Sequence, residues 1–239
     1  MPATSNKQRT LNAVFSTLPK HTDGPVGINS KADSRPVLEQ FIYAICREGN
    51  SRVVADRAYT SLCESFFDWN EIRVSSTREI ADALVDLSQP DVRAQRIIDF
   101  LQQVFEITFS FDLEYLKKKG LKIAAEKLTR IQASNDFCVA WVLQQSLGGH
   151  AVPLDETGVR VLSRLGLIED PTVAPDTVRS SVEHLVPKAK GPIFTDLVGY
   201  LAEDYCWEVD PQCQQCPLAS VCAKAMESKP EAVGAGKGG

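Results

Sequence analysis

Apolar residues recur along most of the chain at the three- and four-residue spacing of amphipathic helices. Leu11, Val14 and Leu18, for example, fall on one face of a helix over residues 6–18. The same spacing predicts helices over residues 34–49, 52–67, 77–87, 92–105, 113–119, 123–131, 136–147, 155–165, 177–185 and 193–205. No segment shows the sustained alternation of apolar and polar positions that is typical of a half-buried strand. The pattern therefore predicts an all-α protein.

The composition is ordinary for a soluble globular protein, with 44% hydrophobic and 24% charged residues among 239. No apolar run approaches the roughly 20 residues needed to cross a bilayer, and residues 1–20 lack the continuous apolar segment of a signal peptide. We therefore expect a cytoplasmic protein with no membrane partner. The formal net charge of −5 argues against strong binding to nucleic acid, because neutralising phosphates requires a basic face.

The seven cysteines fall into two groups. Cys46, Cys63 and Cys138 are scattered among helical segments, where free cysteine commonly behaves as a small buried hydrophobe. The other four lie close together near the C-terminus, with the spacing Cys206-x6-Cys213-x2-Cys216-x5-Cys222. In a reducing compartment such a group favours a metal site over disulfides, and four thiolates can hold zinc or an iron–sulfur cluster. The ligand type alone leaves the metal open.

The cysteine spacing resembles the iron–sulfur cluster loop at the C-terminal end of endonuclease III and its relatives. The resemblance continues upstream and is dense from about residue 128. Residues 131–139 stand where that family has a helix-hairpin-helix turn of the type Leu-Pro-Gly-Val-Gly-Arg-Lys-Thr-Ala, and residues 154–158 stand where it has Val-Asp-Thr-His. The resemblance implies a 4Fe-4S cluster, structural or electronic in role, held by Cys206, Cys213, Cys216 and Cys222.

The resemblance also implies a fold in two lobes. A six-helix barrel containing the helix-hairpin-helix would span residues 34–149, and a cluster lobe would combine residues 1–33 with residues 150–226. Residues 227–239 belong to a tail rich in Ala, Gly, Lys and Pro, which we expect to be disordered.

Several positions depart from the family pattern. Ala133 and Asn135 replace the two hairpin glycines, whose lack of a side chain lets backbone amides approach a phosphate closely. Phe137 stands in place of the lysine that attacks the sugar, which excludes Schiff-base chemistry at this position. Gly49 stands in place of a glutamine that fills the hole left by a flipped base. We therefore expect a degenerate hairpin that binds phosphate weakly.

The catalytic aspartate of the family is present as Asp155. The resemblance implies that this carboxylate stabilises positive charge on the deoxyribose or activates the nucleophile. Asp155 also directly precedes a predicted helix, so an ordinary N-cap is the alternative interpretation.

Basic residues gather just before the hairpin, on the side where the family meets DNA. The residues expected to contact DNA are Lys118, Lys119, Lys122, Lys127 and Arg130, together with Ser134 and Asn135 in the hairpin turn. A solvated helix end is the alternative explanation for the basic run. The cluster loop is not expected to contact phosphate, because residues 201–222 carry four acids and no Lys or Arg.

Two hypotheses about function follow. The first is a monofunctional DNA glycosylase of base-excision repair, a monomer that binds double-stranded DNA weakly to moderately and uses Asp155 in catalysis. The second is a non-catalytic paralogue that keeps the fold and the cluster as a DNA- or partner-binding module. A base-release assay distinguishes the enzyme from the binder.

Overall fold

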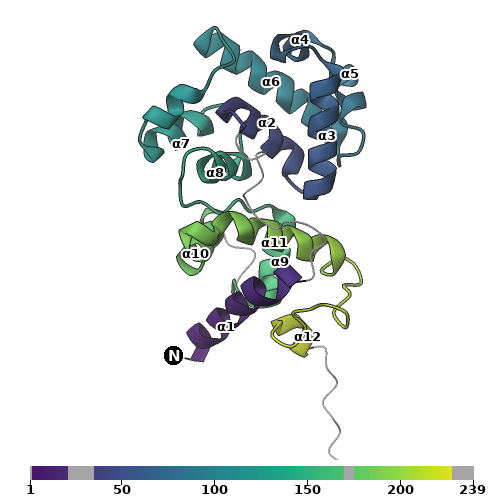
Figure 1. Ribbon diagram of the computed structural model, residues 1–239, viewed down its shortest axis with the longest axis vertical. Coiled ribbons are helices and arrows are strands. Elements are labelled where there is room, and N and C mark those ends of the chain that lie inside the picture. The colour runs from purple at the N-terminus through teal and green to yellow at the C-terminus, as the bar shows by residue number, and fades with distance from the viewer. Residues whose placement is uncertain (1, 21–34, 170–174, 228–239) are drawn as a thin grey trace, which may run out of the picture.

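A computed structural model describes residues 2–20, 35–169 and 175–227, and all regular secondary structure in these ranges is helical (Figure 1). In chain order the elements are α1 (Pro2–Thr17), η1 (Leu18–Lys20), α2 (Val37–Arg47), α3 (Arg52–Ser65), α4 (Trp69–Val74), α5 (Thr77–Ala83), α6 (Pro90–Thr108), η3 (Glu114–Lys118), α7 (Leu121–Thr129), α8 (Asp136–Gln145), α9 (Glu156–Leu165), α10 (Pro175–Leu185), η4 (Lys188–Lys190), α11 (Gly191–Asp204) and α12 (Ala223–Glu227). The predicted all-α class is confirmed. No helix in the described ranges combines the length and the apolar character needed to span a membrane.

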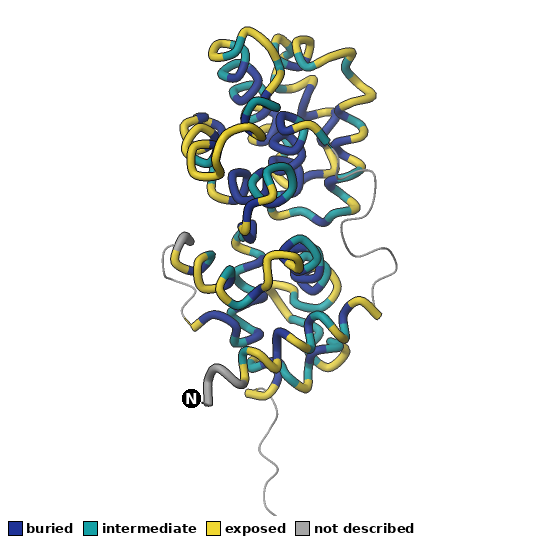
Figure 2. The backbone as a smooth tube through the Cα atoms, turned by 60° about the vertical axis from the view of Figure 1, so that its left-hand side comes forward, coloured by how far each residue is buried: buried dark blue, intermediate teal, exposed yellow. Residues whose placement is uncertain are grey.

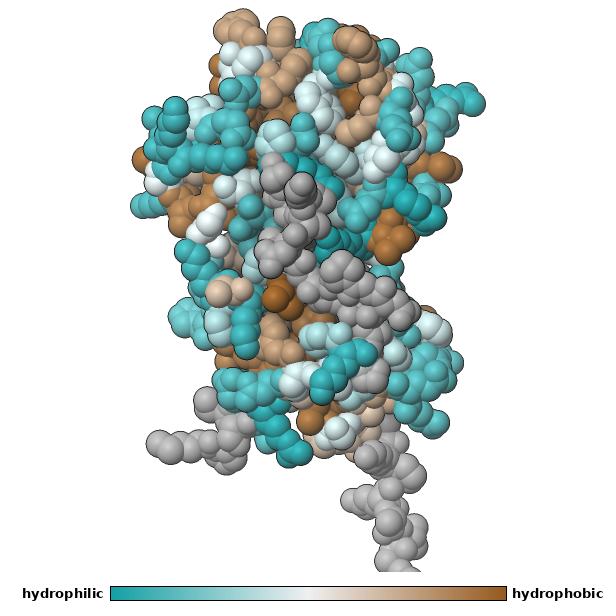
Figure 3. Space-filling model, in the orientation of Figure 1, coloured by the Kyte–Doolittle hydropathy of each residue, from teal (hydrophilic) through white to brown (hydrophobic). Residues whose placement is uncertain are grey.

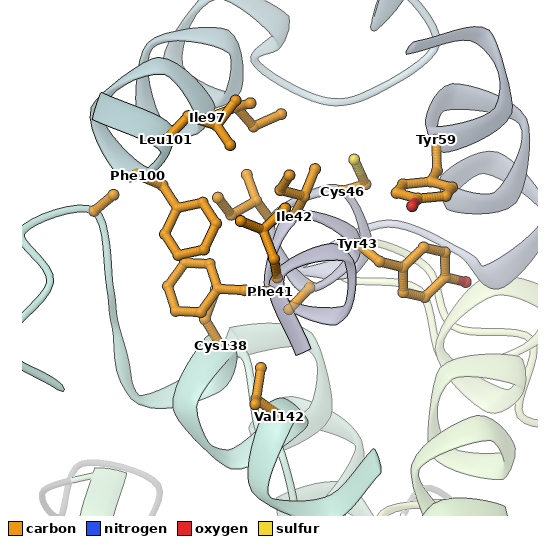
Figure 4. Close-up of a cluster of buried hydrophobic side chains, with 14 of the residues drawn as sticks. Phe41, Ile42, Tyr43, Cys46, Tyr59, Ile97, Phe100, Leu101, Cys138 and Val142 are labelled. Carbon is orange, nitrogen blue, oxygen red and sulfur yellow. The ribbon is translucent and has the colours of Figure 1, made fainter. Parts of the chain in front are cut away.

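One hydrophobic core lies in the upper lobe of Figure 1 and surrounds α2. Every residue of α2 except Glu39 is buried, because α3, α6 and α8 pack around this helix. The ring of Phe41 stacks on that of Phe100 from α6, with the centroids 4.1 Å apart (Figure 4). The indole N–H of Trp141 on α8 donates to the buried side-chain oxygen of Gln40 at 2.9 Å, so the indole is not buried without a partner.

A second core lies in the lower lobe, where α11 packs against both α1 and α9. Leu11 and Val14 of α1 are buried in the same cluster as Leu197 and Leu201 of α11. The helical face predicted for residues 6–18 is therefore the face that α1 buries. Figure 1 shows the purple α1 next to the green α11, so segments far apart in the sequence build this lobe together.

The two cores divide the described residues at a narrow waist (Figure 2). Residues of the first core fall within 37–142, and residues of the second fall within 11–18 and 152–225. We therefore propose a six-helix barrel over residues 34–149 and a cluster lobe over residues 1–33 and 150–226. Of the expected tail, residue 227 ends α12, and residues 228–239 lie outside the described residues.

Polar contacts tie the two lobes together at the waist. Arg52 of α3 pairs with Asp196 of α11 at 3.1 Å, and Arg179 of α10 pairs with Asp136 of α8 at 4.0 Å. Helix α8 also packs directly on α11. The C-terminal end of α2 and the N-terminal ends of α8 and α9 meet at this junction, and the side chains expected to carry the chemistry come from these helix ends.

Some local expectations were wrong. The sequence pattern missed α4, which begins where Asp68 accepts from the Glu71 backbone N–H at 2.8 Å and which buries only Ile72, too little to produce a visible periodicity. It also missed α12, and the helix expected over residues 77–87 ends at residue 83. Cys46 and Cys138 are buried as expected, but Cys63 is exposed, because it lies at the edge of the face through which α3 packs.

Candidate functional site

A cavity of about 230 Å³ lies at the junction of the two lobes. Its walls come from the loop between α2 and α3, the first turn of α8, the segment that leads into α9, and α11. A wider hollow of about 670 Å³ adjoins it, and both are lined by Phe137, Asp155 and Arg160. We call the two hollows together the interlobe cleft. The aspartate and the residue at the lysine position therefore face one cleft.

Asp155 joins the lobes through its carboxylate. It is the N-cap of α9, where Oδ1 accepts from the Gly158 backbone N–H at 2.7 Å. Oδ2 accepts from the Gly49 backbone N–H, which belongs to the other lobe, at 2.9 Å. Asp155 is thus both a helix cap and a half-buried charge in the cleft. Two N–H donors fix the direction in which this charge faces.

Gly49 contacts Asp155 through its backbone N–H group, and it has an unusual backbone conformation. Its φ of +67° lies in the left-handed region, which residues with a side chain rarely adopt. The position that the family fills with an inserting glutamine is therefore occupied by a backbone turn, and what it offers to the cleft is an N–H group.

Phe137 lies in the first turn of α8 and is 5% exposed. Its ring stacks on Trp141, one turn further along the helix, with the centroids 5.9 Å apart. Lys122 and Lys127 on α7, the nearest lysines before the hairpin, line neither hollow of the cleft. Among the residues that line the two hollows there is no lysine amine to attack a sugar.

The hairpin turn between α7 and α8 holds its shape without glycine. Asn135 has a φ of −144°, and neither it nor Ala133 is among the described residues with a positive φ. Asn135 caps α8 by accepting from the Cys138 backbone N–H at 3.0 Å, and its amide donates to Glu48 at 2.7 Å. Its side chain is thus engaged within the protein. The Ser134 hydroxyl oxygen is buried and has no hydrogen-bond partner among the described residues. DNA contact by these two residues stays a prediction.

A partly buried network that the sequence did not reveal connects the hairpin to α2 and α6. Glu48 accepts from Arg96 at 2.7 Å as well as from Asn135, and Arg96 Nη2 also donates to the Cys138 sulfur at 3.4 Å. Burial raises the pKa of Cys138 to about 12, so this thiol stays protonated at neutral pH. The network fixes the hairpin relative to the wall of the cleft.

The basic residues expected to contact DNA lie on one edge of the upper lobe. Lys118, Lys119, Lys122, Lys127 and Arg130 are all exposed on or next to η3 and α7. Helix α7 packs against α8, so the basic run adjoins the hairpin. Figure 3 shows hydrophilic side chains over the left edge of this lobe, where Figure 1 places α7.

The four clustered cysteines surround one small space. Cys206, Cys213, Cys216 and Cys222 line a single narrow cavity between α9, the end of α11 and α12. Burial raises the pKa of Cys216, and the charges of the other three thiols raise it further, which reflects how near they lie. Arg164 of α9 holds the loop by donating to the carbonyl oxygens of Cys206 at 3.4 Å and Glu208 at 2.9 Å. In the described part of the chain, however, no three His, Cys, Asp or Glu side chains are arranged to hold a metal ion.

Comparisons with known proteins show which sequences and folds this chain resembles. No family model matches the chain. It is 24% identical to DEMETER-like protein 2 of Arabidopsis thaliana over 173 residues, which cover 65% of this chain and 13% of that protein. The chain thus spans a small part of the length of this relative.

Solved structures resemble the chain over most of its length. A trapped endonuclease III–DNA covalent intermediate has a TM-score of 0.67 at 15% identity and covers 92% of this chain and 97% of its own. A thermostable thymine-DNA glycosylase has a TM-score of 0.66 at 16% identity and covers 94% of this chain and 99% of its own. At these identities the likeness concerns the fold. The chain therefore has the endonuclease III-like fold of the helix-hairpin-helix DNA glycosylases.

Proposed function

We propose that this protein is a monofunctional DNA glycosylase, which releases a base from double-stranded DNA by hydrolysis. The observation that carries the proposal is the interlobe cleft, in which a carboxylate fixed by N–H donors from both lobes faces an aromatic ring where the family has a lysine. Structures with the same fold include endonuclease III bound to DNA and a thymine-DNA glycosylase.

The chemistry needs a stabilised positive charge at the sugar. The bond between the anomeric carbon and the base nitrogen breaks, and its electron pair leaves with the base. A water oxygen then bonds to the same carbon. One water proton stays on the new hydroxyl group, and the other ends on the released base. Asp155 would stabilise the oxocarbenium-like charge of the transition state, because a fixed negative group in a cleft sheltered from water acts strongly on charge that develops there. Phe137 cannot form the covalent imine of a lyase.

The cysteine loop is proposed to hold a 4Fe-4S cluster. Cys206, Cys213, Cys216 and Cys222 would supply all four ligands, leaving none open to substrate, so that the cluster supplies structural or electronic support. The four thiols line one cavity, and their spacing resembles that of the endonuclease III cluster loop, which supports a cluster over zinc.

DNA binding is proposed to be weak to moderate and to involve a monomer. The exposed basic residues of η3 and α7, next to the hairpin, support a contact with phosphates. The acidic cluster loop does not favour such a contact, because Glu208 and Asp210 are both exposed.

The decisive experiment is a base-release assay over a panel of damaged and mismatched bases, with and without alkali to reveal abasic sites. Asp155→Asn is expected to reduce base release by about 100-fold to 1000-fold, because a neutral amide cannot stabilise the developing charge. The variant should fold normally, since the asparagine oxygen can still cap α9. Asp68→Asn, at the exposed N-cap of α4 and outside the residues that line the cleft, is the matched control and should keep full activity.

Borohydride should trap no covalent protein–DNA adduct, because reduction requires an imine. Efficient trapping by the unmodified protein would contradict the monofunctional route. Full base release by Asp155→Asn would show that Asp155 acts only as a helix cap.

The second candidate is a non-catalytic DNA- or partner-binding paralogue. The turn at Gly49, which cannot fill the hole left by a flipped base, and the internal engagement of Asn135 favour it. Retention of an abasic duplex in a gel shift, with no base released from any lesion, would identify this alternative.

A further inference from the structure

Arg47 is a buried cation whose hydrogen-bonding capacity is largely unused. It is the last residue of α2, it is 6% exposed, and it lines the 230 Å³ cavity of the interlobe cleft. Nη1 donates to the backbone carbonyl of Asn50. Nε is fully buried and has no hydrogen-bond partner among the described residues. In that part of the chain no carboxylate forms an ion pair with Arg47 either.

Two neighbouring arginines differ from Arg47, because acceptors within the protein satisfy their N–H groups. Arg93 donates to three backbone carbonyls, including those of Ile45 and Glu48, and Arg96 pairs with the Glu48 carboxylate. A buried guanidinium with unpaired N–H groups is costly, because each donor has lost its water without gaining a partner. Such a group in a cavity wall is suited to a ligand that brings acceptor atoms.

The opposite wall leaves room for this guanidinium. A Cβ atom at residue 199 of α11 would lie 2.5 Å from Arg47 Nη2, and the glycine found there has none. Gly199 lines the same cavity. Gly199 on α11 thus leaves the space that the Arg47 side chain of α2 occupies between the lobes.

The remaining walls indicate which acceptor fits. Phe137, Phe194 and Val198 contribute apolar surface, as a flipped base requires for stacking and burial. Asp155 and Glu203 line the same cavity and balance the charges of Arg47 and Arg160, so the cavity has no excess positive charge to attract an anionic phosphate. A neutral carbonyl oxygen satisfies the donor without adding charge.

We propose that Arg47 reads the extruded base by donating to its carbonyl oxygen, so that this site selects bases that carry a keto group over bases that carry none. The inference rests on the proposed glycosylase function and names its substrate class. Guanidinium is a donor only, so a base that presents an amino group at this position would set donor against donor.

The test compares keto bases (hypoxanthine and uracil) with bases that have no carbonyl (adenine and 1,N6-ethenoadenine), each in the same duplex. Arg47→Met, which keeps an unbranched apolar side chain and removes the donors, should lower the ratio of keto to non-keto base release at least about tenfold. Arg57→Met, exposed on α3, is the control and should leave the ratio unchanged. An unchanged ratio in a folded Arg47→Met protein would overturn the proposal.

A phosphate contact gives a different pattern. If Arg47 binds backbone phosphate, Arg47→Met weakens binding to a duplex with a tetrahydrofuran abasic analogue as much as to any lesion, and base reading is refuted. If Arg47 reads the base, affinity for this baseless duplex stays within about twofold of that of the unmodified protein, since phosphate contacts are independent of the base.

A second measurement uses the unmodified protein and needs no catalysis. The ¹⁵N resonance of the Arg47 Nε–H group should shift on addition of free hypoxanthine or uracil at millimolar concentration, and not on addition of adenine or inorganic phosphate. A shift with keto bases, without release of any base, would refute the glycosylase function and uphold the base-reading role. Base release without such a shift would uphold the glycosylase function and refute base reading. A shift with phosphate alone would refute base reading.

Discussion

The contact between Gly49 and Asp155 shows how one residue can serve the backbone and the cleft at once. Gly49→Ala places a side chain at a φ of +67°, which should lower the free energy of unfolding by about 1–2 kcal/mol. The same substitution should move the N–H group that holds Asp155 Oδ2 and reduce base release by about tenfold or more.

Gly148→Ala provides the matched control for that prediction. Gly148 has a φ of +63°, and nothing lies within 4 Å of the point where a Cβ atom would stand. It therefore carries the same backbone cost, and it lies outside the residues that line the cleft. Chemical denaturation and a base-release assay on both variants separate the two effects. Equal loss of activity in the two variants would show that strain alone is responsible.

At this scale the sequence predicted the residues that belong to motifs and missed those that depend on distant partners. Asp155 and Phe137 could be placed in one site because each stands at a marked position of the family pattern. Glu48 could not, because its partners Arg96 and Asn135 lie 48 and 87 residues away along the chain. Arg47 was missed because it ends a largely apolar helix and belongs to no motif.

The cluster loop is the element whose cofactor can be tested directly. Protein purified anaerobically should contain about four irons per chain, and Cys213→Ser should give colourless, poorly soluble protein, because the loop is expected to fold around its metal. Cys63→Ser is the control, since this exposed thiol lies on α3 in the other lobe. Stoichiometric zinc, with no iron after anaerobic reconstitution, would contradict the cluster.

Long periodic helices could be predicted, whereas α4 and α12 could not. The pattern located α6, α9 and α11 because each buries one face over several turns. Helix α4 is instead defined by the hydrogen bond at its Asp68 cap, and α12 is only five residues long. Neither feature leaves a strong period in the sequence.

On the scale of the whole molecule, the distribution of charge should decide how DNA binds. Lys118→Glu with Lys119→Glu should lower affinity for duplex DNA and flatten its dependence on salt by about one unit for each lost phosphate contact. Arg57→Glu with Arg78→Glu changes the net charge equally, on α3 and α5, and should have little effect. The affinities are measured by fluorescence anisotropy over a salt series. If both pairs of substitutions weaken DNA binding equally, the net charge of the protein determines the affinity and no defined face contacts the DNA.

The packing of α1 against α11 has a consequence for how the protein is made. The residues of the upper core are continuous in the chain and can pack once α8 has left the ribosome, whereas the lower core has to wait for α11. At roughly 5–20 residues per second, this interval lasts several seconds. Throughout it, Leu11 and Val14 of α1 lack the α11 residues of their core. The lobe that contains α1 is therefore the second to fold.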